Sequence, residues 1–264
     1  MSKALIGNTG FVGSTLTEQT SFTHFFRSTN IEQIENQNFE SIVCAGAPAQ
    51  KWLANREPKK DFMKIEKLIK HLQTISCDQF VLISTVDVFK DPINVNEQTE
   101  INESELNAYG KHRRYLETFV KENFKKSLII RLPGLVGKHL RKNVIFDLKN
   151  KNNLDQINSE DSFQFYPMDN LWRDIQISLK SNLTIVHLTA EPVSVKNVAK
   201  LGFGIDFDNK LDRPSINYDM RTAYGDIFNS SSQYQYTAQD SINAIKLYAS
   251  LNSTPLSLNG EVKG

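Results

Sequence analysis

Three glycines near the N-terminus have a spacing that could bind a phosphate. Gly7, Gly10 and Gly13 form GNTGFVG directly after a short apolar run at 3–6. Glycine permits a tight strand-to-helix turn and close approach of a ligand to the backbone, and the helix that follows presents free N–H groups. The spacing is G-x-x-G-x-x-G, not the strict G-x-G-x-x-G fingerprint of dinucleotide sites. The position after a strand still favours a nucleotide site over a turn that binds nothing. We assign three intervening residues to it, Thr9, Phe11 and Val12.

The end of the second expected strand bears on the choice of nucleotide. NAD sites usually carry an acidic residue about 20 residues further on, which binds the ribose 2′-hydroxyl. At that distance the chain offers Arg27 and Ser28, and no carboxylate lies between them and Glu32. An arginine beside hydroxyl groups suits a 2′-phosphate, so the sequence predicts NADP in preference to NAD. The alternative is that Arg27 is a solvated strand end.

Composition excludes several other functions. The 31 basic and 30 acidic residues leave a net charge of +1, which argues against nucleic-acid and anionic-membrane binding. No apolar run approaches the ~18 residues of a membrane span, and the N-terminus does not resemble a secretory signal, so we expect a cytoplasmic protein. Cys44 and Cys77 are expected to be buried free thiols. The five histidines lack ligand spacing, so no metal site is predicted.

The elements that must position these residues alternate along the chain. Short apolar runs predict buried strands at 3–6, 25–26, 41–45, 80–84, 128–132 and 184–188. Apolar residues at helical spacing between them predict helices around 62–72 and 109–120. This alternation indicates an α/β fold with a doubly wound, Rossmann-like parallel sheet.

The regular alternation of strand and helix patterns ends after Gly137. The segment 138–161 is polar and has one convincing helix, at 144–148, and a last amphipathic helix covers 239–251. We therefore expect a dinucleotide-binding core at 1–137 and a small C-terminal substrate lobe at 138–251, interleaved with the last core elements. A loose tail is expected at 252–264.

Seven segments in sequence order resemble the extended short-chain dehydrogenase/reductases, which include nucleotide-sugar epimerases, dehydratases and 4-keto reductases. They are GNTGFVG, SIVCAGAP, FVLISTVDVF, AYGKHRRYLE, RLPGLVG, FQFYPMDNLWRDI and HLTAEPVSVKNVAK. The resemblance covers almost the whole chain. It implies that the cofactor also contacts the residues at the ends of two further strands, Ala45, Gly46, Ala47, Pro133 and Leu135.

The same resemblance implies catalytic roles for Thr85 and Tyr109. The Tyr109 hydroxyl would act as acid or base on the reacting carbonyl, and the Thr85 hydroxyl would orient the same oxygen. Register with the family favours Thr85 over the neighbouring Ser84. A cation on the Tyr109 helix would lower the tyrosine pKa from about 10 and hold the nicotinamide ribose.

The sequence departs from the family at this cation. The family has lysine four residues after the tyrosine, and this chain has Arg113. Arg113 lies on the Tyr109 face of the helix and can lower a pKa, but it cannot release a proton. Three interpretations stay open: a working Tyr–Arg site, a site that binds nucleotide without turnover, and a Tyr109 that is purely structural. His112 is expected to be a solvated residue facing away from Tyr109.

Four residues are candidates for contacts with the substrate. Asp87, two residues after Thr85, and Asn143, ahead of a helix, are candidates, and Arg213 or Arg221 could clamp a diphosphate. The aromatic residues at 163, 165 and 166 fit a buried strand better than a base-stacking site.

The sequence thus predicts an NAD(P)-dependent reductase or epimerase acting on a nucleotide-linked sugar or similar carbonyl compound. The alternative is a nucleotide-binding regulatory or partner protein that kept the fold and lost catalysis. A homodimer through the Tyr109 helix is left open, because that helix carries Lys111, Arg114 and Lys121 on its outer face.

Overall fold

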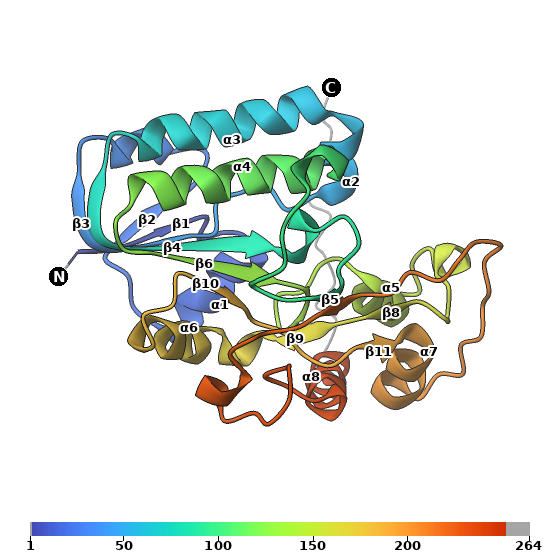
Figure 1. The fold of residues 1–264 in the computed structure, drawn as a ribbon. Helices are drawn as coiled ribbons and strands as arrows, with labels where there is room; N and C mark the ends of the chain where they lie inside the picture. The colour runs from blue at the N-terminus through green and yellow to red at the C-terminus, as the bar shows by residue number, and fades with distance from the viewer. Residues whose placement is uncertain (1, 252–264) are drawn as a thin grey trace, which may run out of the picture.

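The protein, seen in a computed structural model that describes residues 2–251, is built on a six-stranded sheet (Figure 1). The tail expected at 252–264 lies outside the described residues. The strands are β1 (Lys3–Ile6), β2 (His24–Phe26), β3 (Asn38–Cys44), β4 (Ser76–Thr85), β6 (Ser127–Leu132) and β10 (Ile185–His187). Their order is β10-β6-β4-β3-β1-β2 and every pair is parallel, which confirms the predicted doubly wound fold.

Helices cover both faces of this sheet (Figure 1). One face carries α2 (Lys51–Arg56), α3 (Pro58–Leu72) and α4 (Ala108–Asn123), and the other carries α1 (Phe11–Gln19) and α6 (Leu171–Lys180). All six predicted strands are present, with bounds moved by up to four residues. The sequence did not predict the helix α6. Its first residues were noted only as part of the segment FQFYPMDNLWRDI, which resembles a family motif.

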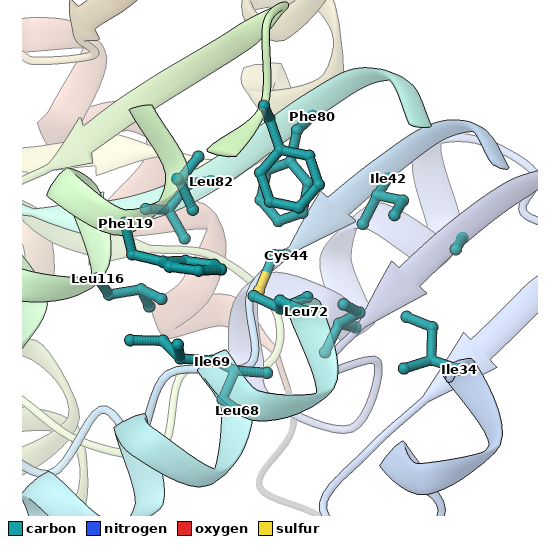
Figure 2. Packing of buried hydrophobic residues seen from close by; sticks show 14 of the residues in the cluster. Ile34, Ile42, Cys44, Leu68, Ile69, Leu72, Phe80, Leu82, Leu116 and Phe119 are labelled. Carbon is teal, nitrogen blue, oxygen red and sulfur yellow. The ribbon is translucent and has the colours of Figure 1, made fainter. Parts of the chain in front are cut away.

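The packing of α3 shows why these elements form. Ile65, Leu68, Ile69 and Leu72 recur at helical spacing and belong to one core cluster. Figure 2 shows Leu68, Ile69 and Leu72 facing alternate side chains of the sheet. The sheet contributes Ile42, Cys44, Phe80 and Leu82 to the same cluster. Cys44 is buried as expected, whereas Cys77 is only half-buried, because it lies near the start of β4 at the edge of this core.

A smaller lobe follows β6 and has a core of its own. It contains β7 (Gly134–Val136) paired with β9 (Phe165–Pro167), β8 (Ser162–Phe163) paired with β11 (Val193–Ser194), and the helices α5 (Val144–Asn150), α7 (Val195–Asn197) and α8 (Ala238–Ser250). A further parallel pair, β5 (Ile93–Val95) with β12 (Asp219–Met220), joins the two halves of the chain. The aromatic residues at 163, 165 and 166 fall on β8 and β9. Phe165 and Tyr166 are buried, as the buried-strand interpretation expected, whereas Phe163 is only half-buried.

The stacked ring pair Phe80–Phe124 gives a test of the core. The two centroids are 4.2 Å apart and Phe80 is fully buried. We expect Phe80→Ala to lower the free energy of unfolding by about 3–5 kcal/mol, because it leaves a cavity that the sheet cannot fill. Urea denaturation measures this. Phe25→Ala, at a site 43% exposed, is the control and should cost far less; equal losses would contradict the packing described.

Candidate active site

A cleft of about 970 Å³ lies at the carboxyl ends of β1, β3, β4 and β6, beside the small lobe. In doubly wound sheets ligands bind at this edge, where the strand order reverses. The predicted site residues that line it are Gly7, Thr9, Gly10, Phe11, Val12, Arg27, Ser28, Ala45, Gly46, Ala47, Thr85, Asp87, Tyr109, Arg113, Pro133, Leu135 and Asn143. Gly13, Arg213 and Arg221 do not line it.

The glycine turn fits a phosphate-binding backbone. Gly7 has φ +88°, and a Cβ there would overlap the carbonyl of Ala45. A Cβ at Gly13 would overlap the Gly7 carbonyl, so Gly13 acts by allowing α1 to start close to β1. No side chain caps α1, and its first turn has no acidic residue. The start of α1 therefore opens on the cleft uncapped, as an anion requires.

A glycine in α4 brings Tyr109 next to the end of β4. A Cβ at Gly110 would overlap the carbonyl of Asp87, so α4 can approach the turn η2 (Val86–Val88) only because residue 110 has no side chain. Asn107 caps α4 by accepting from the Gly110 N–H at 3.0 Å, and Asn55 accepts from the Tyr109 N–H at 3.0 Å. Tyr109 is thereby fixed beside Thr85 and is 8% exposed.

The pKa of Tyr109 is raised above its ordinary value. Burial raises it most, the Arg113 charge lowers it, the Asp87 charge raises it, and a hydrogen bond with Thr85 lowers it. The sequence predicted that the neighbouring cation would bring this pKa down. The Arg113 charge does act in that direction, but the predicted net lowering is wrong, because burial outweighs Arg113. Tyr109 therefore holds its proton near neutral pH.

Arg113 is committed to structural contacts. It is 3% exposed, and its guanidinium carbon lies 3.9 Å from the centroid of the Tyr109 ring. Its terminal nitrogens donate to both oxygens of Asp61 and to the carbonyls of Pro48 and Tyr109. Its Nε is buried without a partner among the described residues. Of its five N–H donors, only the one at Nε is left for a ribose hydroxyl.

His112 is not the solvated residue that the sequence predicted. Its Nδ1 lies 2.7 Å from an Asp61 oxygen, and its side chain is only 12% exposed. Asp61 on α3 thus contacts two consecutive residues of α4. Burial alone would raise the pKa of Asp61, but hydrogen bonds from Arg113 and His112 outweigh burial and lower it.

A cluster centred on Asp87 was largely missed from the sequence. Asp87 Oδ1 accepts from Lys51 Nζ at 2.6 Å and from the Tyr218 hydroxyl at 3.1 Å, and Oδ2 accepts from Thr85 Oγ1 at 3.3 Å. Burial would lower the pKa of Lys51, but the Asp87 and Tyr218 charges outweigh it and raise this pKa. No motif flags Lys51 or Tyr218, which come from α2 and from the chain before β12; only the fold brings them together.

Three of the residues predicted to contact the substrate, Asn143, Arg213 and Arg221, bond to other groups of the protein. The Asn143 side chain accepts from the Ile145 N–H at 3.0 Å and donates to the Leu135 carbonyl at 2.9 Å, so it caps α5 at the cleft wall. Arg213 forms a two-pronged pair with Asp161, and Arg221 forms one with Asp219. A diphosphate clamp from either arginine is therefore not assembled here.

The cleft suits a polyanionic nucleotide. Among the described residues that line it, six are lysine or arginine and one, Asp87, is acidic. With the uncapped start of α1 and the glycine turn, this donor set fits a dinucleotide held by its phosphates.

No protein-family model and no curated protein matches the sequence. The structure is similar to dTDP-4-dehydrorhamnose reductase from Yersinia enterocolitica, with a TM-score of 0.71 and 16% identity over 94% of this chain and 99% of that one. UDP-glucose 4-epimerase from Thermotoga maritima, solved with UDP-glucose, gives 0.71 and 12% over 94% and 98%. RMD from Pseudomonas aeruginosa, complexed with NADPH, gives 0.69 and 13% over 94% and 97%.

The chain has the fold of the extended short-chain dehydrogenase/reductases. The resemblance noted in the sequence is thus confirmed at the level of the fold. Within residues 2–251, no group of three or more His, Cys, Asp or Glu side chains is placed to bind a metal ion. Within the same residues, no helix has the length and apolar character needed to span a bilayer.

The Asp61–Arg113 pair gives a test of the site's framework. We expect Asp61→Asn to lower the free energy of unfolding by about 3 kcal/mol or more, because it leaves a buried guanidinium without its counter-charge. Urea denaturation at neutral pH measures this. Glu103→Gln, at the exposed partner of Arg114, is the control and should cost less than ~1 kcal/mol.

The pH dependence of the same variant follows from the lowered pKa of Asp61. The carboxylate stabilises the fold fully above its ordinary pKa of 3.8, and this stabilisation is lost as the pH falls through the lower folded-state value. The difference between wild type and Asp61→Asn should therefore shrink only in strong acid. A difference that disappears by pH 5 would contradict the pairing.

Proposed function

We propose that this chain is an NAD(P)-dependent reductase or epimerase of the extended short-chain dehydrogenase/reductase type. The observation that carries the proposal is that the Tyr109 and Thr85 hydroxyls line the same cleft as the glycine turn. The neighbouring folds support it, since they include reductases and epimerases of sugar nucleotides. The bound dinucleotide would supply or accept a hydride.

Tyr109 would be the general acid. Its raised pKa keeps the phenol protonated at neutral pH, so it can give a proton to a carbonyl oxygen as the carbon is reduced. In the reverse direction the phenolate would take that proton back. The stacked Arg113 cation stabilises the phenolate that forms during reduction, although its other contacts hold it in place.

Thr85 would orient the substrate oxygen. Its hydroxyl bonds to the Asp87 carboxylate at 3.3 Å, and Lys51 holds the same carboxylate from the other side. This hydroxyl has one proton, so it would turn from Asp87 to donate to the substrate oxygen, while Asp87 keeps the Thr85 side chain in place. Lys51 and Asp87 would act as positioning residues for Thr85.

The substrate we propose is a nucleotide-linked sugar or a similar carbonyl compound. Phe163, Phe165 and Tyr218 pack together as an aromatic wall of the cleft. Lys142 also lines the cleft, where its Nζ donates to the Ala49 carbonyl. Burial and the Arg113 charge lower the pKa of Lys142. Because Arg213 and Arg221 are paired elsewhere, Lys142 is the better candidate for an anionic group of the substrate.

One observation favours a second function, a nucleotide-binding partner protein without turnover. The guanidinium of Arg113 has four of its five donors in intramolecular contacts, so little of it is left to hold a nicotinamide ribose. The two functions differ in one experiment. Nucleotide released on denaturing the purified protein is identified by mass spectrometry, and the protein is then assayed with NADPH or NADH and a panel of sugar nucleotides and simple carbonyls. Binding with turnover supports the enzyme, binding without turnover supports the partner protein, and no binding contradicts both.

Removing the Tyr109 hydroxyl gives the most direct test of the proposed proton donor. Tyr109→Phe should reduce turnover by about 10²- to 10⁴-fold, because the proton donor is lost, while NADPH still binds with similar affinity. Steady-state rates and fluorescence titration measure the two effects. Tyr115→Phe, on the same helix and 44% exposed, is the matched control. Unchanged turnover in Tyr109→Phe would contradict the assigned acid.

A further inference from the structure

The loop that follows β3 meets three cations of the cleft. Its Pro48 carbonyl accepts a hydrogen bond from Arg113 of α4. Its Ala49 carbonyl accepts one from Lys142 of the small lobe. Lys51, two residues further on, begins α2. All three cations line the cleft, so this loop brings together positive charges from three separate parts of the chain.

Two of these charges are neutralised and the third is not. Arg113 pairs with Asp61, and Lys51 pairs with Asp87. Lys142 forms no ion pair within residues 2–251. Its ammonium has three N–H donors, of which the loop carbonyl takes one, so two are left for a ligand. The loop therefore carries one positive charge that no carboxylate balances.

The chain on both sides of Lys142 is held in place. Asn143 Nδ2 donates to the Leu135 carbonyl at 2.9 Å, and the Tyr248 hydroxyl donates to the Leu140 carbonyl at 3.3 Å. Leu140 is buried, and it lines the cleft together with Leu135 and Asn143. Lys142 thus starts from a packed segment of the small lobe, and its ammonium reaches the loop after β3.

The small lobe offers this one charge to a substrate. Of its described residues that line the cleft, Lys142 is the only charged one. A diphosphate carries a negative charge on each phosphate, and arginine is its favoured partner. Arg213 and Arg221 are each paired with an aspartate instead. The lobe therefore matches a substrate with a single negative charge better than one with a diphosphate.

The Lys142 charge lies near the proposed acid. Burial lowers the pKa of Lys142 most, the Arg113 charge lowers it further, and the Asp87 charge raises it. Arg113 stacks on the Tyr109 ring, and Asp87 bonds to Thr85. An anion on Lys142 would therefore lie close to the reacting carbonyl. In a 4-keto sugar nucleotide, by contrast, the sugar ring separates the carbonyl from the diphosphate.

We propose that Lys142 binds the carboxylate of an oxo acid whose carbonyl group bonds to Tyr109 and Thr85, so that the substrate is a small monoanion. This rests on the proposed function, and it narrows the substrates to carbonyl compounds that are not sugar nucleotides. Reduction gives the hydroxy acid: the carbonyl carbon gains a hydride from the reduced dinucleotide, and the oxygen gains the Tyr109 proton. The aromatic wall of the cleft would pack against the rest of the molecule.

The experiment measures kcat/KM for the reduction of oxo acids and of their uncharged esters with NADPH or NADH. Phenylpyruvate, benzoylformate, acetoacetate and levulinate are each compared with the methyl ester, which keeps the carbonyl and removes the charge. In the pair that reacts fastest, the wild type should prefer the acid by about 10- to 100-fold, because the ester loses a hydrogen bond between charged groups. dTDP-4-dehydro-6-deoxyglucose should react more slowly than the best acid.

Substitution of Lys142 shows whether this side chain causes the preference. Lys142→Gln should lower kcat/KM for the acid by about 10- to 100-fold and bring it to the level of the ester, with the same dissociation constant for NADPH. Lys142→Arg keeps the charge and should keep most of the preference. Arg141→Gln is the matched control, since Arg141 is an exposed neighbour that does not line the cleft, and it should leave the preference intact.

Other results would overturn the inference and leave the proposed function standing. They are equal kcat/KM for acids and esters, faster reduction of the sugar nucleotide, and equal losses in Lys142→Gln and Arg141→Gln. Weaker NADPH binding by Lys142→Gln would assign Lys142 to the dinucleotide. Faster reduction of dihydroxyacetone phosphate than of every oxo acid would replace the carboxylate by a phosphate monoester. If the wild type reduces no carbonyl compound, the proposed function fails and the inference fails with it.

Discussion

The pairing of Asp61 with Arg113 is the contact on which the geometry of the cleft depends. Asp61 lies on α3 and Arg113 on α4, and both are almost fully buried. The same guanidinium bonds to the Pro48 carbonyl, after β3, and stacks on the Tyr109 ring. One side chain therefore fixes two helices, one loop and the proposed acid relative to one another. Because an unpaired charge is costly in this setting, the arrangement has little freedom to relax.

Close backbone approaches supply the second constraint. Gly7 and Gly13 let α1 begin against β1, and Gly110 lets α4 press against the end of β4. In each place a Cβ would overlap a carbonyl group. A larger residue at any of these glycines would push the backbone segments apart and change the shape of the cleft. The apolar clusters on both faces of the sheet hold the helices and strands at fixed distances from one another.

The two ends of the cleft differ in their electrostatics. Near Tyr109 the charges are paired, Lys51 with Asp87 and Arg113 with Asp61, so this end is close to neutral and its hydroxyl groups are oriented. Away from Tyr109 the cleft is lined by Arg27, after β2, and by Lys64 and Lys67 of α3, and among the described residues no acidic side chain lines that part. The β2 end therefore favours a polyanionic nucleotide, and the end near Tyr109 fits the neutral carbonyl group of the proposed substrate.

The sequence by itself determined the alternation of strands and helices, the glycine turn and the helix face shared by Tyr109 and Arg113. These features are local, because they follow from periodicity and from backbone freedom at single residues. Tertiary structure alone decided the partners of the charged side chains. Nothing near Arg113 in the sequence indicates Asp61, and Lys51, Asp87 and Tyr218 are far apart along the chain. Arg213 and Arg221 looked available as phosphate ligands until the fold placed Asp161 and Asp219 beside them. The pKa of Tyr109 likewise depends on burial, which a sequence shows only once its helices and strands are packed.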